Sequence, residues 1–144
     1  MDNRSHVVEI LRAWWVPLAI LWAFPWTLCG ASVGVLLLAT GGRVRRIGRV
    51  LEFCGGWAPR LLTRVPIAGG ASAITLGHTV LALDQASLDR TRQHERVHVA
   101  QYERWGPLFV PAYLLASALL WLRGRDPYWE NPFEVEAYRI DQID

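Results

Sequence analysis

The stretch "RTRQHERVHVAQYERWG", residues 90–106, carries the pattern H-E-x-x-H in His94, Glu95 and His98. Residues four apart in an α-helix project from one face, one turn apart, so both imidazoles can reach the same cation. The residue after the first histidine lies beside this pair, where a glutamate can exchange protons with a reacting water. The stretch therefore predicts a zinc-binding helix that carries its own general base.

The flanks of the motif predict where this helix begins and ends. In "SLDRTRQHERVHVAQYERWG", Ser87 is a candidate N-cap and Asp89 lies in the first turn. Gly106, followed directly by Pro107, is a plausible stop. The motif is therefore expected near the middle of one continuous helix.

A zinc site of this kind needs a third protein ligand and leaves one position for water and substrate. Downstream, "NPFEVEAYRI" at residues 131–140 predicts a helix that begins around Pro132. Glu134 shares a helix face with Tyr138 four residues later, whereas Glu136 points roughly the other way. We expect His94, His98 and Glu134 to bind Zn²⁺, with Glu95 as the catalytic base.

Other polar residues are open alternatives near this site. His78 is a possible fourth ligand that would close the site, or a histidine satisfied elsewhere. Gln101 and Tyr102 lie one turn beyond His98 and can bond a ligand or a reacting oxyanion. For Tyr102 and Tyr138 the other reading is packing.

These motifs resemble a known enzyme class. H-E-x-x-H followed by a helix-borne glutamate resembles the gluzincin branch of zinc metallopeptidases. The segment "FEVEAY" is similar to the F-E-x-x-A-D element of the membrane CAAX-prenyl-protease and heat-shock membrane protease family, with Glu134 at the ligand position. Ala137 matches the family's Ala, and Tyr138 stands where the family has Asp. The string "HERVHVAQYERWGPLFVPAYL" with "NPFEVEAYR" also resembles a group of small bacterial membrane proteins, from which no activity carries over.

Residues 14–40 contain no charged side chain and include four of the chain's eight tryptophans. As a helix this run is about 40 Å long, against a hydrocarbon core of roughly 30 Å. It is too long for the apolar part of a signal peptide. The run therefore predicts a retained transmembrane helix that spans with tilt or bends at Pro17 and Pro25.

An arginine cluster follows this run, in Arg43, Arg45, Arg46 and Arg49. The excess of arginine on this side places the rest of the chain in the cytoplasm, and the cluster can also bind anionic lipid headgroups. We therefore expect a membrane anchor at residues 1–49 and a zincin-like metal-binding domain at residues 50–144, on the cytoplasmic side of a bacterial inner membrane.

Residues 50–83 are rich in glycine, proline and β-branched residues. Short strands are predicted near 71–76 and 78–83, with Gly77 between them at a bulge, a kink or a close approach. The segment "GHTVLAL" can serve as an edge strand that pairs with substrate, or as a plain core strand. The predicted fold class is α+β.

The apolar run at residues 107–122 tests the site hypothesis. A single crossing here would place Glu134 on the opposite side of the membrane from His94 and His98. Sixteen residues reach only about 24 Å as a helix, and the run contains two prolines. We therefore expect it to dip into the membrane, lie at its interface or pack in the core.

Composition narrows the function further. A net charge of +2 gives no electrostatic support to a general nucleic-acid role, and an apolar fraction of 52% favours membrane association. Cys29 and Cys54 form neither a metal motif nor a disulfide framework.

The prediction is a zinc-dependent, membrane-anchored peptidase. Its expected partners are membrane lipid and a peptide or membrane-protein substrate, with the chain acting alone or completed by a second copy or partner subunit. The alternative is a non-catalytic zinc-binding or structural membrane protein that binds a membrane partner.

Overall fold

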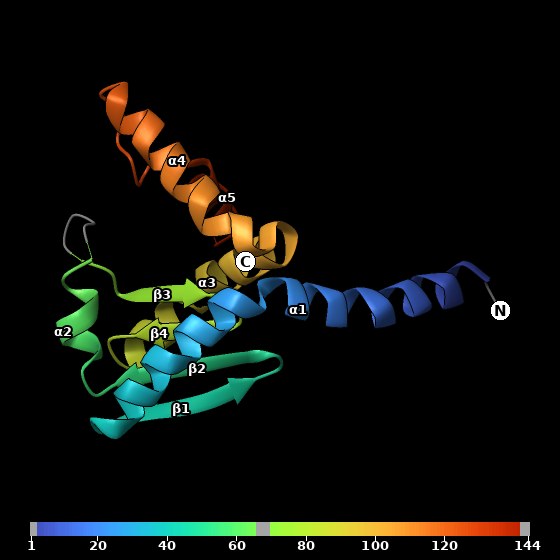
Figure 1. Ribbon diagram of the computed structural model, residues 1–144, viewed down its shortest axis with the longest axis horizontal. Coiled ribbons are helices and arrows are strands. Elements are labelled where there is room, and N and C mark those ends of the chain that lie inside the picture. Colours follow the sequence, from blue (N-terminus) through green and yellow to red (C-terminus); the bar gives the residue numbers. More distant parts are fainter. Residues whose placement is uncertain (1–2, 66–69, 142–144) are drawn as a thin grey trace.

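A computed structural model describes residues 3–65 and 70–141. It shows a mixed α+β architecture with an N-terminal apolar helix and one four-stranded sheet (Figure 1). The elements in chain order are α1 (Asn3–Ala39), β1 (Gly42–Ile47), β2 (Val50–Gly55), α2 (Ala58–Leu62), β3 (Ala73–Leu76), β4 (Thr79–Ala82), α3 (Gln85–Trp105), the 3-10 turn η1 (Gly106–Leu108), α4 (Phe109–Leu122) and α5 (Pro132–Asp141).

The strand order of the sheet is β1-β2-β4-β3. β2 runs parallel to β4, and the two other pairings are antiparallel. β4 is therefore an inner strand, and all four of its residues are buried. Of the two readings of "GHTVLAL", the core strand is confirmed and the edge strand is wrong, because β1 and β3 form the two edges of the sheet.

The sheet lies between two helical layers. On one face, Leu37 of α1 and the short helix α2 pack with Phe53 and Leu81. On the other face, Leu88 and Val99 of α3 pack with β2 and β4. Figure 1 shows the C-terminal half of α1 crossing the sheet while its N-terminal half extends away from it. The sequence predicted α1 only as a membrane anchor and did not predict that α1 packs on the sheet.

Small residues allow this close packing of α1. Gly34 lies so close to Phe53 that an added Cβ would stand 2.6 Å from its ring, and a Cβ on Gly30 would stand 2.8 Å from the Cβ of Thr79. The outer face of the same helix exposes Leu28, Val35 and other large apolar side chains. α1 thus presents one face to the protein and another to its surroundings.

Among the residues that the structure describes, two helical segments are long and apolar enough to cross a membrane, by length and composition. One is Trp15–Ala39 within α1, and the other is Gln85–Leu122, which joins α3 to α4 through η1. The first contains most of the predicted apolar run. The second owes its apolar character to α4, because α3 is rich in charged residues.

The arginine cluster lies largely in a strand that the sequence analysis did not predict. β1 has the sequence GRVRRI, and its four central residues are exposed, so no apolar alternation marks it as a strand. The predicted domain boundary between residues 49 and 50 falls at the β1–β2 turn, and the arginine-rich flank is therefore part of the sheet.

α3 begins three residues earlier than predicted. Its N-cap is Asp84, whose carboxylate accepts a hydrogen bond from the Ser87 N–H at 2.7 Å, so the prediction of Ser87 as the cap is wrong. The predicted stop is confirmed, since Gly106 caps the helix with φ +55°. A Cβ there would stand 2.2 Å from the Trp22 ring of α1, so both space and backbone require glycine.

Gly77 forms the turn between β3 and β4, so we expect Gly77→Ala to destabilise the protein by about 2–4 kcal/mol. Its φ is +61°, and a Cβ would stand 2.5 Å from the backbone nitrogen of Thr27 in α1. Chemical unfolding in detergent measures the loss. Gly48→Ala is the matched control, because Gly48 has φ +62° but nothing within 4 Å of an added Cβ. An equal loss in both variants would contradict the role given to the α1 contact.

Candidate metal centre

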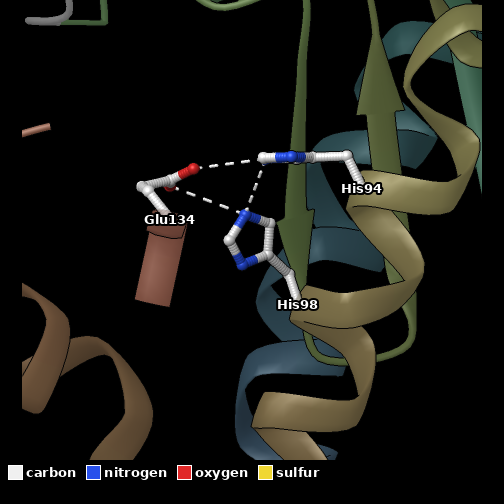
Figure 2. Close-up of side chains that lie close together, drawn as sticks. All are labelled: His94, His98 and Glu134. Atoms are coloured by element: carbon white, nitrogen blue, oxygen red, sulfur yellow. Dashed lines mark hydrogen bonds and ion pairs between the residues drawn. The ribbon is translucent and has the colours of Figure 1, made fainter. Parts of the chain in front are cut away.

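Three buried side chains from two helices meet beside β3. His94 and His98 project from α3, and Glu134 projects from the first turn of α5. The two Nε2 atoms lie 3.1 Å apart. Glu134 Oε2 lies 3.2 Å from Nε2 of His94, and Oε1 lies 3.5 Å from Nε2 of His98. Figure 2 shows the three side chains pointing toward one another.

These separations fit one small cation. Tetrahedral ligands at the usual zinc–nitrogen and zinc–oxygen distances lie about 3.3 Å from one another. The three measured separations, 3.1, 3.2 and 3.5 Å, all lie close to that edge length. The buried group of His94, His98 and Glu134 could therefore hold a metal ion.

The state of the Glu134 carboxylate also supports a bound cation. Glu134 Oε2 is buried and has no hydrogen-bond partner, although it lies at ion-pair distance from His94. Burial raises the pKa of this carboxyl, but the contacts with the two imidazoles and with the Tyr113 hydroxyl outweigh burial and lower the pKa to about 2. A buried carboxylate that stays ionised, with one oxygen lacking a hydrogen bond, is suited to bind a cation.

Further side chains bond two members of the group. The Tyr113 hydroxyl, from α4, donates to Glu134 Oε1 at 2.7 Å. Gln101 Oε1 lies 2.8 Å from His98 Nδ1, so Gln101 bonds a candidate metal ligand. Tyr113 was missed in the sequence, because it lies in a run that reads as uniformly apolar.

Glu95 is buried beside the group and is not part of it. Its Oε2 accepts a hydrogen bond from the Thr75 hydroxyl at 2.7 Å. Thr75 lies on β3, so the edge strand fixes the carboxylate of the motif helix. Nothing in the local sequence marked Thr75, because its role depends on which strand forms the sheet edge.

The other candidate residues have different surroundings. His78 lies away from the group. Its ring Nε2 lies 2.9 Å from Glu103 Oε1, and its backbone N–H donates to the Thr27 hydroxyl. His78 is therefore not a fourth ligand. The Tyr102 hydroxyl donates to the Thr75 carbonyl at 3.1 Å.

Tyr138 lies against one of the ligand residues. Its ring centroid is 4.4 Å from that of His94. Its hydroxyl lies 3.0 Å from the hydroxyl of Tyr128. The Tyr138 ring therefore packs on a candidate metal ligand.

A cavity of about 600 Å³ opens above the ligand group. Its lining includes β3, Val110 and Leu114 of α4, and His94, Glu95 and His98 of α3. A small molecule in the cavity can therefore contact both the candidate metal-binding residues and Glu95.

α4 does not separate the ligands. The chain returns along α4, with the Ser117 hydroxyl donating to the Pro127 carbonyl and Asn131 Nδ2 donating to the Tyr113 carbonyl. Glu134 thus comes back to the two histidines, as the site hypothesis requires. Phe109 and Leu120 of the run are buried, whereas Leu115 and Leu122 are 61% and 72% exposed, so the run packs in the protein core only in part.

Comparison of the chain with protein-family models, curated protein sequences and solved structures finds no match. Support for a metal centre therefore comes only from the positions of this chain's own residues. The resemblance to gluzincins stays a prediction.

Proposed function

We propose that the protein is a zinc-dependent, membrane-anchored peptidase with Glu95 as general base. The observation that carries the proposal is the set of ligand separations near 3.3 Å. Two imidazoles and one carboxylate form a donor set typical of catalytic zinc. Within residues 15–65 and 70–140, no fourth histidine, cysteine or carboxylate joins the group, which leaves one coordination position for substrate chemistry.

The chain's own residues supply the proton transfers. Zinc held by His94, His98 and Glu134 would supply Lewis acidity, which lowers the pKa of water and polarises a peptide carbonyl. Glu95 takes a proton from the attacking water and delivers it to the leaving amine. Thr75 keeps the Glu95 carboxylate in position through its 2.7 Å hydrogen bond.

The edge strand β3 supports a peptide as substrate. The Leu83 N–H donates to the Ser72 carbonyl, so Ser72 directs its main-chain carbonyl toward β4. Alternate residues of an antiparallel strand face opposite ways, so Ala73 and Thr75 direct their main-chain N–H and carbonyl groups away from β4. The Thr75 carbonyl is already bonded to Tyr102. An extended peptide can therefore pair with both main-chain groups of Ala73 and with the Thr75 N–H.

The apolar helices support action at a membrane. In this proposal α1 anchors the protein in a bacterial inner membrane, with Arg43, Arg45 and Arg46 of β1 on the cytoplasmic side near anionic lipid. Leu114 of α4 is exposed and lines the cavity, and further exposed leucines lie on the same helix, which favours a membrane-proximal peptide or a membrane protein as substrate.

The second candidate function is a non-catalytic zinc-binding or structural membrane protein that binds a membrane partner. The ion-pair distances within the group support its structural form, because such contacts also stabilise a buried triad without a metal. Structural zinc sites usually have four protein ligands and need no general base. The buried Glu95 at the cavity therefore favours the peptidase.

Metal analysis of the full-length protein in detergent tests the proposed centre. We expect about one zinc per chain in the wild type and at least about 100-fold weaker zinc binding in His94→Ala and Glu134→Ala. His78→Ala is the matched control, because it removes an equally buried imidazole outside the group and should keep the zinc. Equal zinc content in all four proteins would remove the proposed centre.

A further inference from the structure

Gln101 lies between the two ligand-bearing helices and is 0% exposed. Its Nε2 donates to the Phe133 carbonyl at 3.0 Å and to Glu136 Oε2 at 2.9 Å. Its Oε1 lies 2.8 Å from His98 Nδ1. One side chain on α3 therefore contacts a proposed ligand of α3, the residue before the proposed ligand of α5, and a carboxylate of α5.

The direction of these hydrogen bonds fixes the form of His98. A carbonyl and a carboxylate can only accept, so the amide NH₂ of Gln101 must face Phe133 and Glu136. Glu136 is held as a carboxylate partner by Arg104, whose Nη2 lies 2.7 Å from Oε1. The amide oxygen of Gln101 must then face His98, so His98 Nδ1 carries the proton.

With its proton on Nδ1, neutral His98 has its lone pair on Nε2, the atom that lies near His94 Nε2 and Glu134. We propose that Gln101 is a positioning residue that selects the metal-ligating form of His98 and fixes the spacing between α3 and α5. This inference rests on the proposed metal centre.

The same network gives a role to Glu136, the second glutamate of "FEVEAY". Arg104, Glu136, Gln101 and His98 form a continuous chain of hydrogen bonds. A carboxylate that accepts from the Gln101 amide polarises it and makes its oxygen a stronger acceptor. That oxygen in turn raises the basicity of Nε2 in His98, which strengthens a bond to a cation.

Zinc affinity measured by competition with a chromophoric chelator tests this role in the full-length protein. Gln101→Leu, which removes every bond of the amide, should weaken zinc binding by about 10–100-fold. Gln85→Leu is the control, because this exposed glutamine at the start of α3 bonds the Asp89 side chain, far from the group, and should change nothing.

A pair of variants separates this role from general packing. Gln101→Glu keeps an acceptor for His98 but loses both donors and faces Glu136, so its affinity should fall. The double variant Gln101→Glu/Glu136→Gln restores a donor between the two helices and should recover affinity to within about threefold of the wild type. If Gln101→Leu fails to fold, these two variants carry the test, and no recovery in the double variant would overturn the proposal.

Nitrogen NMR of ¹⁵N-histidine-labelled protein gives a readout that packing alone would not change. With zinc chelated and the imidazole in its neutral form, wild-type His98 should carry its proton on Nδ1, and Gln101→Leu should populate the form protonated on Nε2. An unchanged His98 spectrum, or zinc affinity within about twofold of the wild type, would overturn the role of Gln101.

His94→Ala, measured in parallel, separates this inference from the proposed function. Zinc loss in His94→Ala with full affinity in Gln101→Leu would refute Gln101 as a positioning residue and leave the centre intact. Full zinc affinity in His94→Ala would refute both.

Discussion

Replacing Glu95 with glutamine is expected to lower peptide hydrolysis by about 10²–10⁴-fold while zinc stays bound. Glu95 is not one of the ligand residues, and its Oε2 contacts Thr75 on β3. Glutamine has nearly the same shape and can still accept the Thr75 hydrogen bond, but its amide cannot take a proton from water. The loss should therefore fall on turnover and not on metal content.

Cleavage of a mixture of quenched fluorescent peptides in detergent, at matched zinc content, measures this effect. Glu130→Gln is the control, because the Glu130 carboxylate lies outside the cavity lining. It accepts hydrogen bonds from the Arg125 side chain and the Asp126 backbone N–H. Full activity in Glu95→Gln would assign the general base to another group. A zinc-loaded wild type that cleaves neither these peptides nor membrane-protein substrates would favour the non-catalytic alternative.

The ligand group could be predicted from sequence because each part depends on local geometry. His94 and His98 share a helix face at any position in any fold, and Glu134 lies on a helix whose start is marked by Pro132. The distinction between Glu134 and Glu136 also came from helical periodicity. In the structure Glu134 joins the imidazoles, and Glu136 bonds Gln101 and Arg104 instead.

The parts that sequence could not predict depend on how elements meet. The residues of a strand do not determine its place in the sheet, so "GHTVLAL" was compatible with an edge strand or a core strand until its pairing with both β2 and β3 was seen. Thr75 and Tyr113 gained their roles from that arrangement and from the return of the chain along α4. The role of α1 in covering the sheet was hidden, because an apolar helix reads the same against lipid or protein.

Zinc is expected to raise the unfolding free energy by about 4 kcal/mol when its free concentration is about 1,000 times its Kd. The reason lies in the positions of the ligands. His94 and His98 place two Nε2 atoms 3.1 Å apart in a buried site, and Glu134 comes from a separate helix. A cation that bonds all three joins α5 to α3, and the unfolded chain offers no such preformed site.

Thermal unfolding in detergent, with zinc buffered or chelated, measures this stabilisation. For a chain of this size, about 4 kcal/mol corresponds to a rise of roughly 8–16 °C in Tm. Glu134→Gln keeps the shape of the side chain but removes the charged ligand, so its Tm should respond far less to zinc. An equal zinc-dependent rise in this variant would place the stabilising ion elsewhere in the protein. An unchanged wild-type midpoint would mean that the two imidazoles and the carboxylate are an ion-paired cluster of the core, because a cation bound to the folded state alone must raise Tm.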